Sequence, residues 1–211
     1  MTRIEAVVSD FGGVLTSPLL NSFVALQDSS GISLESLGKA MGAIWERDGA
    51  HPLFELETGR MTEAAFLQSL GDELSRQLGR DVEMHGFGER YFAHLHPNQQ
   101  LIEYMSALRD RGYKLAICTN NVREWAHRWR AMLPVEEIFS VVVDSAFVGV
   151  RKPERRIYEI TLERLGVAPD AALMVDDIEL NCDGARDAGM SAVWFQSTEQ
   201  AIDEIEVALA D

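Results

Sequence analysis

Basic residues are scarce in this sequence of 211 residues. Nineteen lysines and arginines stand against 34 aspartates and glutamates, which gives a formal net charge of −15 at pH 7. A surface of this sign repels the phosphates of DNA and RNA, because binding to a polyanion depends on cationic side chains that displace its counterions. We therefore expect no nucleic-acid partner.

Long apolar runs and cysteines are also few. Apolar stretches such as 171–175 fall far short of the roughly 20 residues that a membrane-spanning helix needs. Two cysteines, Cys118 and Cys182, are too few for a disulfide framework, and residues 1–5 do not start a signal peptide. The sequence thus predicts a cytoplasmic protein with reduced thiols and no membrane partner.

Apolar side chains, in contrast, are numerous enough for a sizeable core. They make up 46% of the chain, and charged residues make up 25%. This composition is typical of a globular protein and excludes collagen-like and disordered chains. At roughly 150 residues per domain, the length corresponds to one core with an insertion, or to one large domain.

Short apolar runs bounded by polar residues recur along the chain. Such runs are typical of strands in a parallel sheet that helices cover on both faces. They occupy residues 4–8, 113–118, 139–143, 172–175 and 192–195. Amphipathic helical patterns separate them, one after the candidate N-cap Asn98 and another ending at Gly166. The alternation predicts an α/β fold with a doubly wound, Rossmann-like parallel sheet.

Residues 17–95 interrupt this alternation. They contain helical apolar stripes, for example over 34–45 and 66–74, and no convincing strand. Thr62 is a suitable N-cap for the second of these helices. We interpret 17–95 as a small helical cap inserted after the first strand, with residues 1–16 and 96–211 forming the core.

Polar side chains follow three of the predicted strands, at the point where each strand ends. They are Asp10 after the first strand, Thr119 and Asn120 after the second, and Asp176 and Asp177 after the fourth. The carboxyl ends of parallel strands meet at one edge of the sheet, where open α/β folds bind ligands. Lys152, in a loop before a helix, can join them. Carboxylates, a hydroxyl and an ammonium group around one point suggest a divalent cation that bridges the protein to a phosphate.

These residues lie in four segments that resemble, in order, the four motifs of the haloacid dehalogenase superfamily of hydrolases. The segments are 7–15, 117–121, 151–158 and 174–189. The resemblance extends over essentially the whole chain and includes Glu57, Gly59 and Phe66 in the cap. Within the superfamily, the sequence resembles subfamily IA, the branch with a helical C1 cap. In that branch it is similar to α-glucose-1-phosphate phosphatases and to the N-terminal phosphatase-like domain of epoxide hydrolases.

The resemblance implies a Mg²⁺-dependent phosphatase acting on a small phosphorylated metabolite, such as a sugar phosphate. Asp10 would be the nucleophile and would form an aspartyl-phosphate that water hydrolyses. Thr119 and the adjacent backbone amide of Asn120 would bind the phosphoryl oxygens, and Lys152 would neutralise their charge.

The resemblance also implies the ligands of the Mg²⁺ ion. These would be Asp10, the backbone carbonyl of Gly12, and Asp177, with Asp176 as a second carboxylate ligand or as an orienter of Lys152. The sequence does not decide between these two roles of Asp176, and it does not predict an oligomeric state.

Gly12 departs from the family's pattern, in which a second aspartate two residues after the nucleophile acts as general acid and base. A good leaving group, as in an acyl or anomeric phosphate, or a proton from a cap residue or water, would compensate for the loss. The glycine is also compatible with a 2-haloacid dehalogenase, which needs no metal, with a phosphonate hydrolase using Lys39, or with a non-catalytic phosphate sensor. The Asp176–Asp177 pair argues against the dehalogenase.

Other side chains give weaker signals. His94 and His96 offer only two ligands for a zinc ion, with no third in sight. Trp45, Arg47 and His51 are candidate contacts for a polar substrate. Trp125 and Trp129 lie four residues apart in an expected helix, a spacing that indicates packing or a subunit contact.

Overall fold

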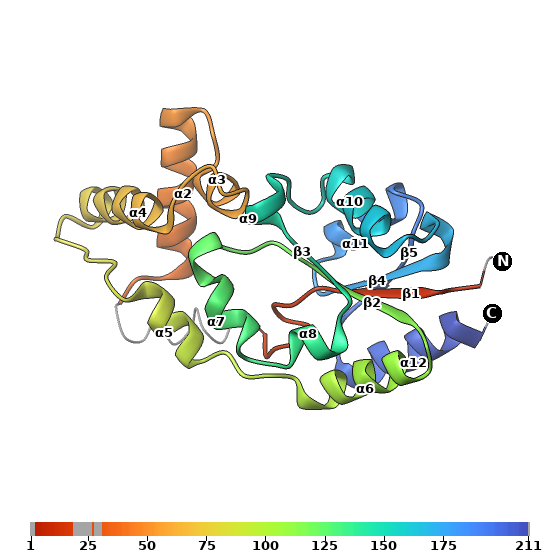
Figure 1. Ribbon diagram of the computed structural model, residues 1–211. Helices are drawn as coiled ribbons and strands as arrows, with labels where there is room; N and C mark the ends of the chain where they lie inside the picture. The colour runs from red at the N-terminus through yellow and green to blue at the C-terminus, as the bar shows by residue number, and fades with distance from the viewer. Residues whose placement is uncertain (1–2, 19–26, 28–30, 211) are drawn as a thin grey trace.

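A five-stranded parallel sheet forms the centre of the protein in a computed structural model that describes residues 3–18, 27 and 31–210 (Figure 1). The strand order is β3-β2-β1-β4-β5, and each neighbouring pair is parallel. The strands are β1 (Ala6–Ser9), β2 (Lys114–Thr119), β3 (Val141–Asp144), β4 (Ala172–Asp176) and β5 (Ser191–Trp194). Each overlaps an apolar run identified in the sequence, so the doubly wound α/β sheet is confirmed.

Helices cover both faces of this sheet (Figure 1). Those of the core are α6 (Gln99–Asp110), α7 (Ala126–Arg130), α8 (Val135–Ile138), α9 (Ser145–Val148), α10 (Arg155–Leu165), α11 (Glu179–Asp187) and α12 (Thr198–Ala210), with the 3₁₀ turns η1 (Arg123–Trp125) and η2 (Pro169–Ala171). Val7 of β1 packs in one apolar cluster with Leu101 of α6 and Ile205 of α12, whereas Val8 packs with Ile157 of α10 in another. Burial on both faces explains the unbroken apolar strands.

Local capping residues fix where several helices begin. The Asn98 side chain accepts a hydrogen bond from the backbone N–H of Leu101 at the start of α6. Thr62 accepts one from Ala65 at the start of α4 (Glu63–Leu78). Both side chains satisfy backbone donors that have no partner within the helix, as predicted for these positions. No helix in the described part of the chain is long and apolar enough to cross a membrane.

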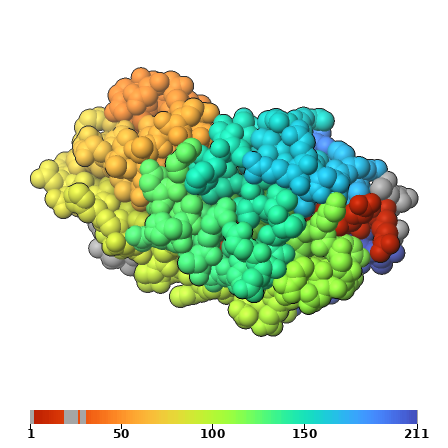
Figure 2. Space-filling model, viewed as in Figure 1, coloured from red at the N-terminus to blue at the C-terminus, as the bar shows by residue number. Residues whose placement is uncertain are grey.

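Among the described residues between β1 and α6, four helices lie beyond the carboxyl ends of the strands (Figure 1). They are α2 (Leu34–Asp48), α3 (Pro52–Glu57), α4 and α5 (Phe87–Ala93). Ile44, Phe66 and Leu74 belong to a separate apolar cluster that also includes Val122 of the core, and this end of the molecule packs directly against the rest (Figure 2). We refer to these helices as the cap. Part of the expected insertion, 19–26 and 28–30, lies outside the described residues.

The chain leaves and re-enters the core at neighbouring points. Thr16 and Pro97 form an isolated antiparallel bridge, and the backbone N–H of Ser17 donates to the carbonyl of His96 over 2.7 Å. These contacts lie beside the boundaries expected at 16/17 and 95/96, which stay a prediction.

Gly59 allows the cap to approach the core closely. Its φ is +67°, and a Cβ at this position would lie 2.3 Å from the carbonyl oxygen of Ala146. Any other residue would be strained in this conformation and would push α9 away. The glycine thus holds the end of α3 against the edge of the core.

Candidate active site

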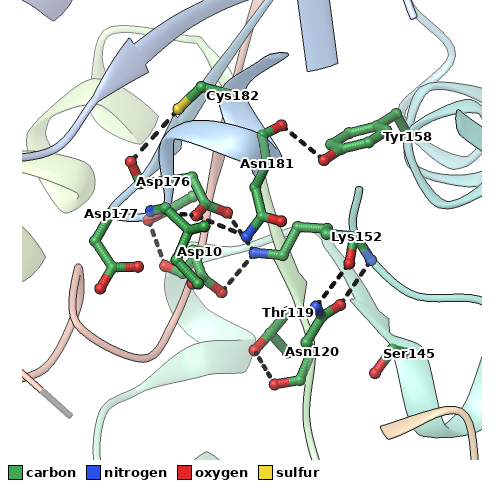
Figure 3. A network of polar contacts seen from close by, with 12 residues as sticks. Asp10, Thr119, Asn120, Ser145, Lys152, Tyr158, Asp176, Asp177, Asn181 and Cys182 are labelled. Carbon is green, nitrogen blue, oxygen red and sulfur yellow. Dashed lines mark hydrogen bonds and ion pairs between the residues drawn. The ribbon is translucent and has the colours of Figure 1, made fainter. Parts of the chain in front are cut away.

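Side chains from three strand ends and one loop converge at one edge of the sheet (Figure 3). Asp10 follows β1, Thr119 ends β2 and Asp176 ends β4, while Lys152 comes from the loop between α9 and α10. These four side chains lie in residues that are less than 10% exposed. The parallel register accounts for the convergence, because it places the three strand ends side by side.

The ammonium group of Lys152 lies between two carboxylates. Its Nζ is 2.8 Å from Oδ1 of Asp10 and 2.5 Å from Oδ2 of Asp176. Burial disfavours the charge on this lysine, but the two carboxylates outweigh burial and raise the pKa of the ammonium above its ordinary value. Lys152 is therefore a fixed positive charge beside Asp10.

Asn120 holds the backbone of Lys152 in place. Its Oδ1 accepts a hydrogen bond from the lysine N–H over 2.8 Å, and its Nδ2 donates to the lysine carbonyl over 3.0 Å. The Asn120 side chain is thus committed to positioning the loop, and phosphate binding through its backbone amide stays a prediction. The hydroxyl of the neighbouring Thr119 has only a long contact, 3.5 Å, with the carbonyl of Asn120.

Asp176 has hydrogen-bond donors at both carboxylate oxygens. Oδ1 accepts from the backbone N–H of Ile178 and from Nδ2 of Asn181, each over 2.9 Å, and Oδ2 faces Lys152. This arrangement suits a residue that orients the lysine. The sequence interpretation gave Asn181 no role, although it lies in the segment 174–189, four residues after Asp177, and this position could have indicated one.

Three carboxylates could share one cation. Asp10, Asp176 and Asp177 each offer an oxygen, and these oxygens lie within 4.8 Å of one another; no other such group of His, Cys, Asp or Glu, including His94 and His96, occurs among the described residues. Burial raises the pKa of Asp10 to about 7, against the opposing charge of Lys152, and raises the pKa of Asp177 to about 6. A hard divalent cation would stabilise the ionised forms, so this donor set fits Mg²⁺.

The turn after Asp10 leaves room for Asp177. Gly13 has a φ of +81°, and a Cβ there would lie 2.2 Å from Oδ2 of Asp177. The left-handed backbone of this turn therefore falls at Gly13, next to Gly12, which lines the cavity. Glycine at 13 lets the Asp177 carboxylate pack against the chain.

A cavity of about 320 Å³ opens from these residues into the cap. Asp10, Thr119, Lys152 and Asp177 line one part of it. Trp45, Arg47 and His51 do not line it: Trp45 is 52% exposed, Arg47 pairs with Asp48, and His51 stacks on Phe54. These candidate substrate contacts therefore lie outside the cavity. The same holds for Lys39, an exposed residue paired with Glu35.

The cap and the loop of Lys152 are joined by an ion pair that the sequence interpretation did not identify. Nε of Arg151 lies 2.6 Å from Oε2 of Glu57, at the end of α3, and its guanidinium lies 4.0 Å above the ring of Phe54. Ser145 donates a hydrogen bond from its hydroxyl to the carbonyl of Glu57 over 2.5 Å. The cap thus contacts the chain immediately before Lys152.

Two curated relatives illustrate the similarity to known proteins. Acyl-CoA dehydrogenase family member 10 of Mus musculus is 27% identical over 97% of this chain, which spans only 19% of the mouse protein. A Mycobacterium tuberculosis protein named Phosphatase MT3486 is 30% identical over 96% of this chain and 92% of its own length. Both matches cover nearly all of the present sequence.

Solved structures show the same fold. A predicted HAD-like hydrolase of Porphyromonas gingivalis superposes with a TM-score of 0.72 at 23% identity, covering 100% of both chains. The enzyme bt-2542 of Bacteroides thetaiotaomicron, solved in complex with magnesium and inorganic phosphate, gives a TM-score of 0.67 at 20% identity over 92% of this chain and 96% of its own. The profile of haloacid dehalogenase-like hydrolases matches residues 4–189, so the chain belongs to this hydrolase family.

Proposed function

We propose that this protein is a Mg²⁺-dependent phosphatase that transfers the phosphoryl group of a small monoester first to Asp10 and then to water. The observation that carries the proposal is the buried Lys152 ammonium, held 2.8 Å from Asp10 and 2.5 Å from Asp176 at the foot of the cavity. Residues 1–16 and 96–211 would supply the chemistry, and 17–95 would enclose the substrate.

In the first step, a carboxylate oxygen of Asp10 attacks phosphorus in line with the ester oxygen. A bond forms between Asp10 and phosphorus, the ester bond breaks, and the departing oxygen takes its proton from water. A second water molecule then attacks the aspartyl-phosphate, releases inorganic phosphate and restores the carboxylate. Dividing the displacement into two steps lowers each barrier.

The surrounding groups stabilise the negative charge that the phosphoryl oxygens bring. Lys152 offers a fixed ammonium, and Thr119 offers a hydroxyl at the end of β2. Asp10, Asp177 and the carbonyl of Gly12 would hold Mg²⁺, with Asp176 orienting Lys152. When bound, the ion supplies Lewis-acid charge neutralisation at the phosphate.

Replacement of the nucleophile tests this proposal. Asp10→Asn should lower kcat for p-nitrophenyl phosphate by at least about 1,000-fold, because an amide is not a nucleophile at phosphorus. The fold should persist, since burial already disfavours the charged carboxylate. Asp183→Asn, at an exposed position of α11 paired with Arg186, is the matched control and should keep wild-type activity.

Three outcomes would contradict the proposal. Activity of Asp10→Asn above a tenth of the wild-type value would exclude Asp10 as the nucleophile. Release of chloride from 2-chloropropionate without metal would establish a dehalogenase instead. Binding of phosphate by calorimetry, with no turnover of any monoester or phosphonate, would establish a non-catalytic sensor.

A further inference from the structure

The cavity beside Asp10 has walls that are mainly apolar. Apart from Glu57 and Glu63, its lining from the cap is built of aliphatic and aromatic side chains on α2, α3, α4 and α5. Leu37, Leu56 and Phe66 are examples, and each is less than 10% exposed. Only the part formed by the core, around Asp10 and Lys152, carries a group of polar side chains suited to phosphate.

Three aromatic rings stand nearly parallel in this wall. Tyr91 and Trp125 stack with ring centroids 5.0 Å apart and planes 26° apart, and Phe87 lies 6.2 Å from Trp125 at 19°. All three residues line the cavity. Such an array offers offset stacking and edge contacts to a further ring, which adds to the affinity gained from burial alone.

Charged side chains in the wall outside the Asp10–Lys152 centre already have partners. Glu57 is paired with Arg151 over 2.6 Å. Oε1 of Glu63 accepts a hydrogen bond from the indole N–H of Trp125 over 2.7 Å. Substrate hydroxyls lying against the aliphatic and aromatic side chains would lose water without gaining equivalent bonds, and each unpaired hydroxyl lowers affinity by about ten-fold. The lining disfavours a sugar.

From this lining and the proposed chemistry, on which the inference rests, we propose that the substrate is a phosphate monoester whose organic part is a compact aromatic group without hydroxyls. The phosphate would lie at Asp10 and Lys152, and the ring would lie against Tyr91 and Trp125. Gly12 supports the same assignment independently. A phenolic leaving group is far more acidic than an alkanol, so it departs without the general acid that position 12 lacks.

A substrate series separates the effect of the wall from the effect of the leaving group. Benzyl phosphate and glycerol 3-phosphate both release primary alcohols of similar acidity and differ chiefly in polarity. The specificity constant kcat/KM should be about 100-fold higher for benzyl phosphate, the gain expected from burying one ring. Cyclohexylmethyl phosphate is equally apolar but cannot stack, and it should fall clearly below benzyl phosphate.

A variant in the wall provides a second test. Met41 is half-buried on α2 and lines the cavity. Met41→Gln keeps the length of the side chain and adds an amide, so it should lower the ratio of kcat/KM for benzyl phosphate over glycerol 3-phosphate by about ten-fold. Met41→Leu, the matched apolar control, should keep the ratio within about two-fold. If Met41→Gln does not fold, the comparison of the three substrates with the wild-type enzyme still tests the inference.

The results distinguish failure of this inference from failure of the proposed function. Turnover of p-nitrophenyl phosphate with equal kcat/KM for benzyl and glycerol phosphates would overturn the aromatic assignment and leave the phosphatase intact. Equal kcat/KM for benzyl and cyclohexylmethyl phosphates would also overturn the aromatic assignment and leave the phosphatase intact. If no monoester is hydrolysed, the proposed function fails, and calorimetry still tests the cavity: benzylphosphonate should bind more tightly than methylphosphonate, and equal affinities would overturn the inference.

Discussion

Because residue 12 is a glycine, it cannot donate the proton that the leaving oxygen needs. Phosphatases of the family that the sequence resembles carry an aspartate at this position. General acid catalysis by such a residue raises the rate about 10²- to 10⁴-fold. Residue 12 of this chain is a glycine, so it has no carboxylate to take that role. The rate of the wild-type enzyme should therefore depend steeply on the acidity of the leaving group.

Gly12→Asp should flatten that dependence. In the wild type, phenyl phosphate should be hydrolysed much faster than benzyl phosphate, whereas the variant should narrow the gap by supplying a proton to the alkoxide. The measurement is kcat for a series of aryl and alkyl phosphates, with circular dichroism to verify folding. If the wild type hydrolyses both kinds at similar rates, and the folded variant only loses activity, another group supplies the proton.

Asp144 predicts a pH dependence of stability. Burial raises the pKa of this carboxyl to about 6, although the backbone N–H of Ala146 and the indole of Trp129 favour its charged form. The native state then keeps a proton that the unfolded state loses near pH 4. The contribution of Asp144 to the free energy of unfolding should fall by about 3 kcal/mol as pH rises from about 4 to about 6, and stay constant above.

Asp144→Asn isolates this effect. The difference in unfolding free energy between variant and wild type, from urea melts at several pH values, should rise in favour of the variant between pH 4 and 6. The slope is the readout, because the amide also changes contacts in ways that do not depend on pH. A difference that is flat over this range would show that Asp144 ionises normally.

At the scale of elements, the sequence patterns predicted the strands and the helix starts, which depend on interactions between neighbouring residues. The strands followed from apolar runs, and the starts of α4 and α6 followed from Thr62 and Asn98, because strand burial and helix capping involve neighbouring residues. The same patterns brought Asp10, Thr119 and Asp176 to one edge of the sheet. The topology of parallel strands makes that inference possible without knowledge of any side-chain contact.

Contacts between distant segments could not be predicted in this way. Asn120 pairs with Lys152 from 32 positions away, and Glu57 pairs with Arg151 from 94 positions away. Their side chains are ordinary polar residues in the sequence, and only the folded chain shows which partner each one meets. The apolar lining of the cavity could not be predicted for a related reason. Apolar residues such as Leu56 and Phe66 give the same sequence pattern whether they face a hydrophobic core or a ligand.

The contact between α3 and the Lys152 loop gives a prediction at this scale. Glu57→Gln should leave the largely buried guanidinium of Arg151 without its counter-charge and lower the free energy of unfolding by about 2 kcal/mol. It should also lower kcat/KM, because the displaced loop carries Lys152. Chemical denaturation and steady-state kinetics measure the two effects.

A second glutamate of the same helix serves as control. Glu55 pairs with Arg60 at the surface, so Glu55→Gln should change the free energy of unfolding by less than about 1 kcal/mol and leave kcat/KM unchanged. If the two variants behave alike, the pair between Glu57 and Arg151 does not support the loop.

At the scale of the whole molecule, the protein carries a net charge of −15 and concentrates three carboxylates around one lysine. A cation bound there should stabilise the native state by mass action, by about 1.4 kcal/mol when free Mg²⁺ is ten times its Kd. Thermal melts with and without MgCl₂, at constant ionic strength, should show a rise in Tm of about 3 to 6 °C.

The rise in Tm should depend on the site and not on general screening of charge. Asp177→Asn should abolish it, and EDTA should reverse it in the wild type. Asp72→Asn, which removes an exposed acid of α4 outside the cluster, should leave it unchanged. An equal rise in all three proteins would assign the effect to the acidic surface.

The wall of the cavity is also the hydrophobic core of the cap. Leu37, Leu56 and Leu70 belong to the buried cluster that holds α2, α3 and α4 together, and the same residues line the cavity. A substitution that retunes the choice of substrate therefore also changes the packing that keeps the cap folded, at a cost of about 2 to 5 kcal/mol for a large truncation. New specificities on this scaffold would have to arise together with compensating stabilisation elsewhere, so its evolvability is limited by the stability of the cap.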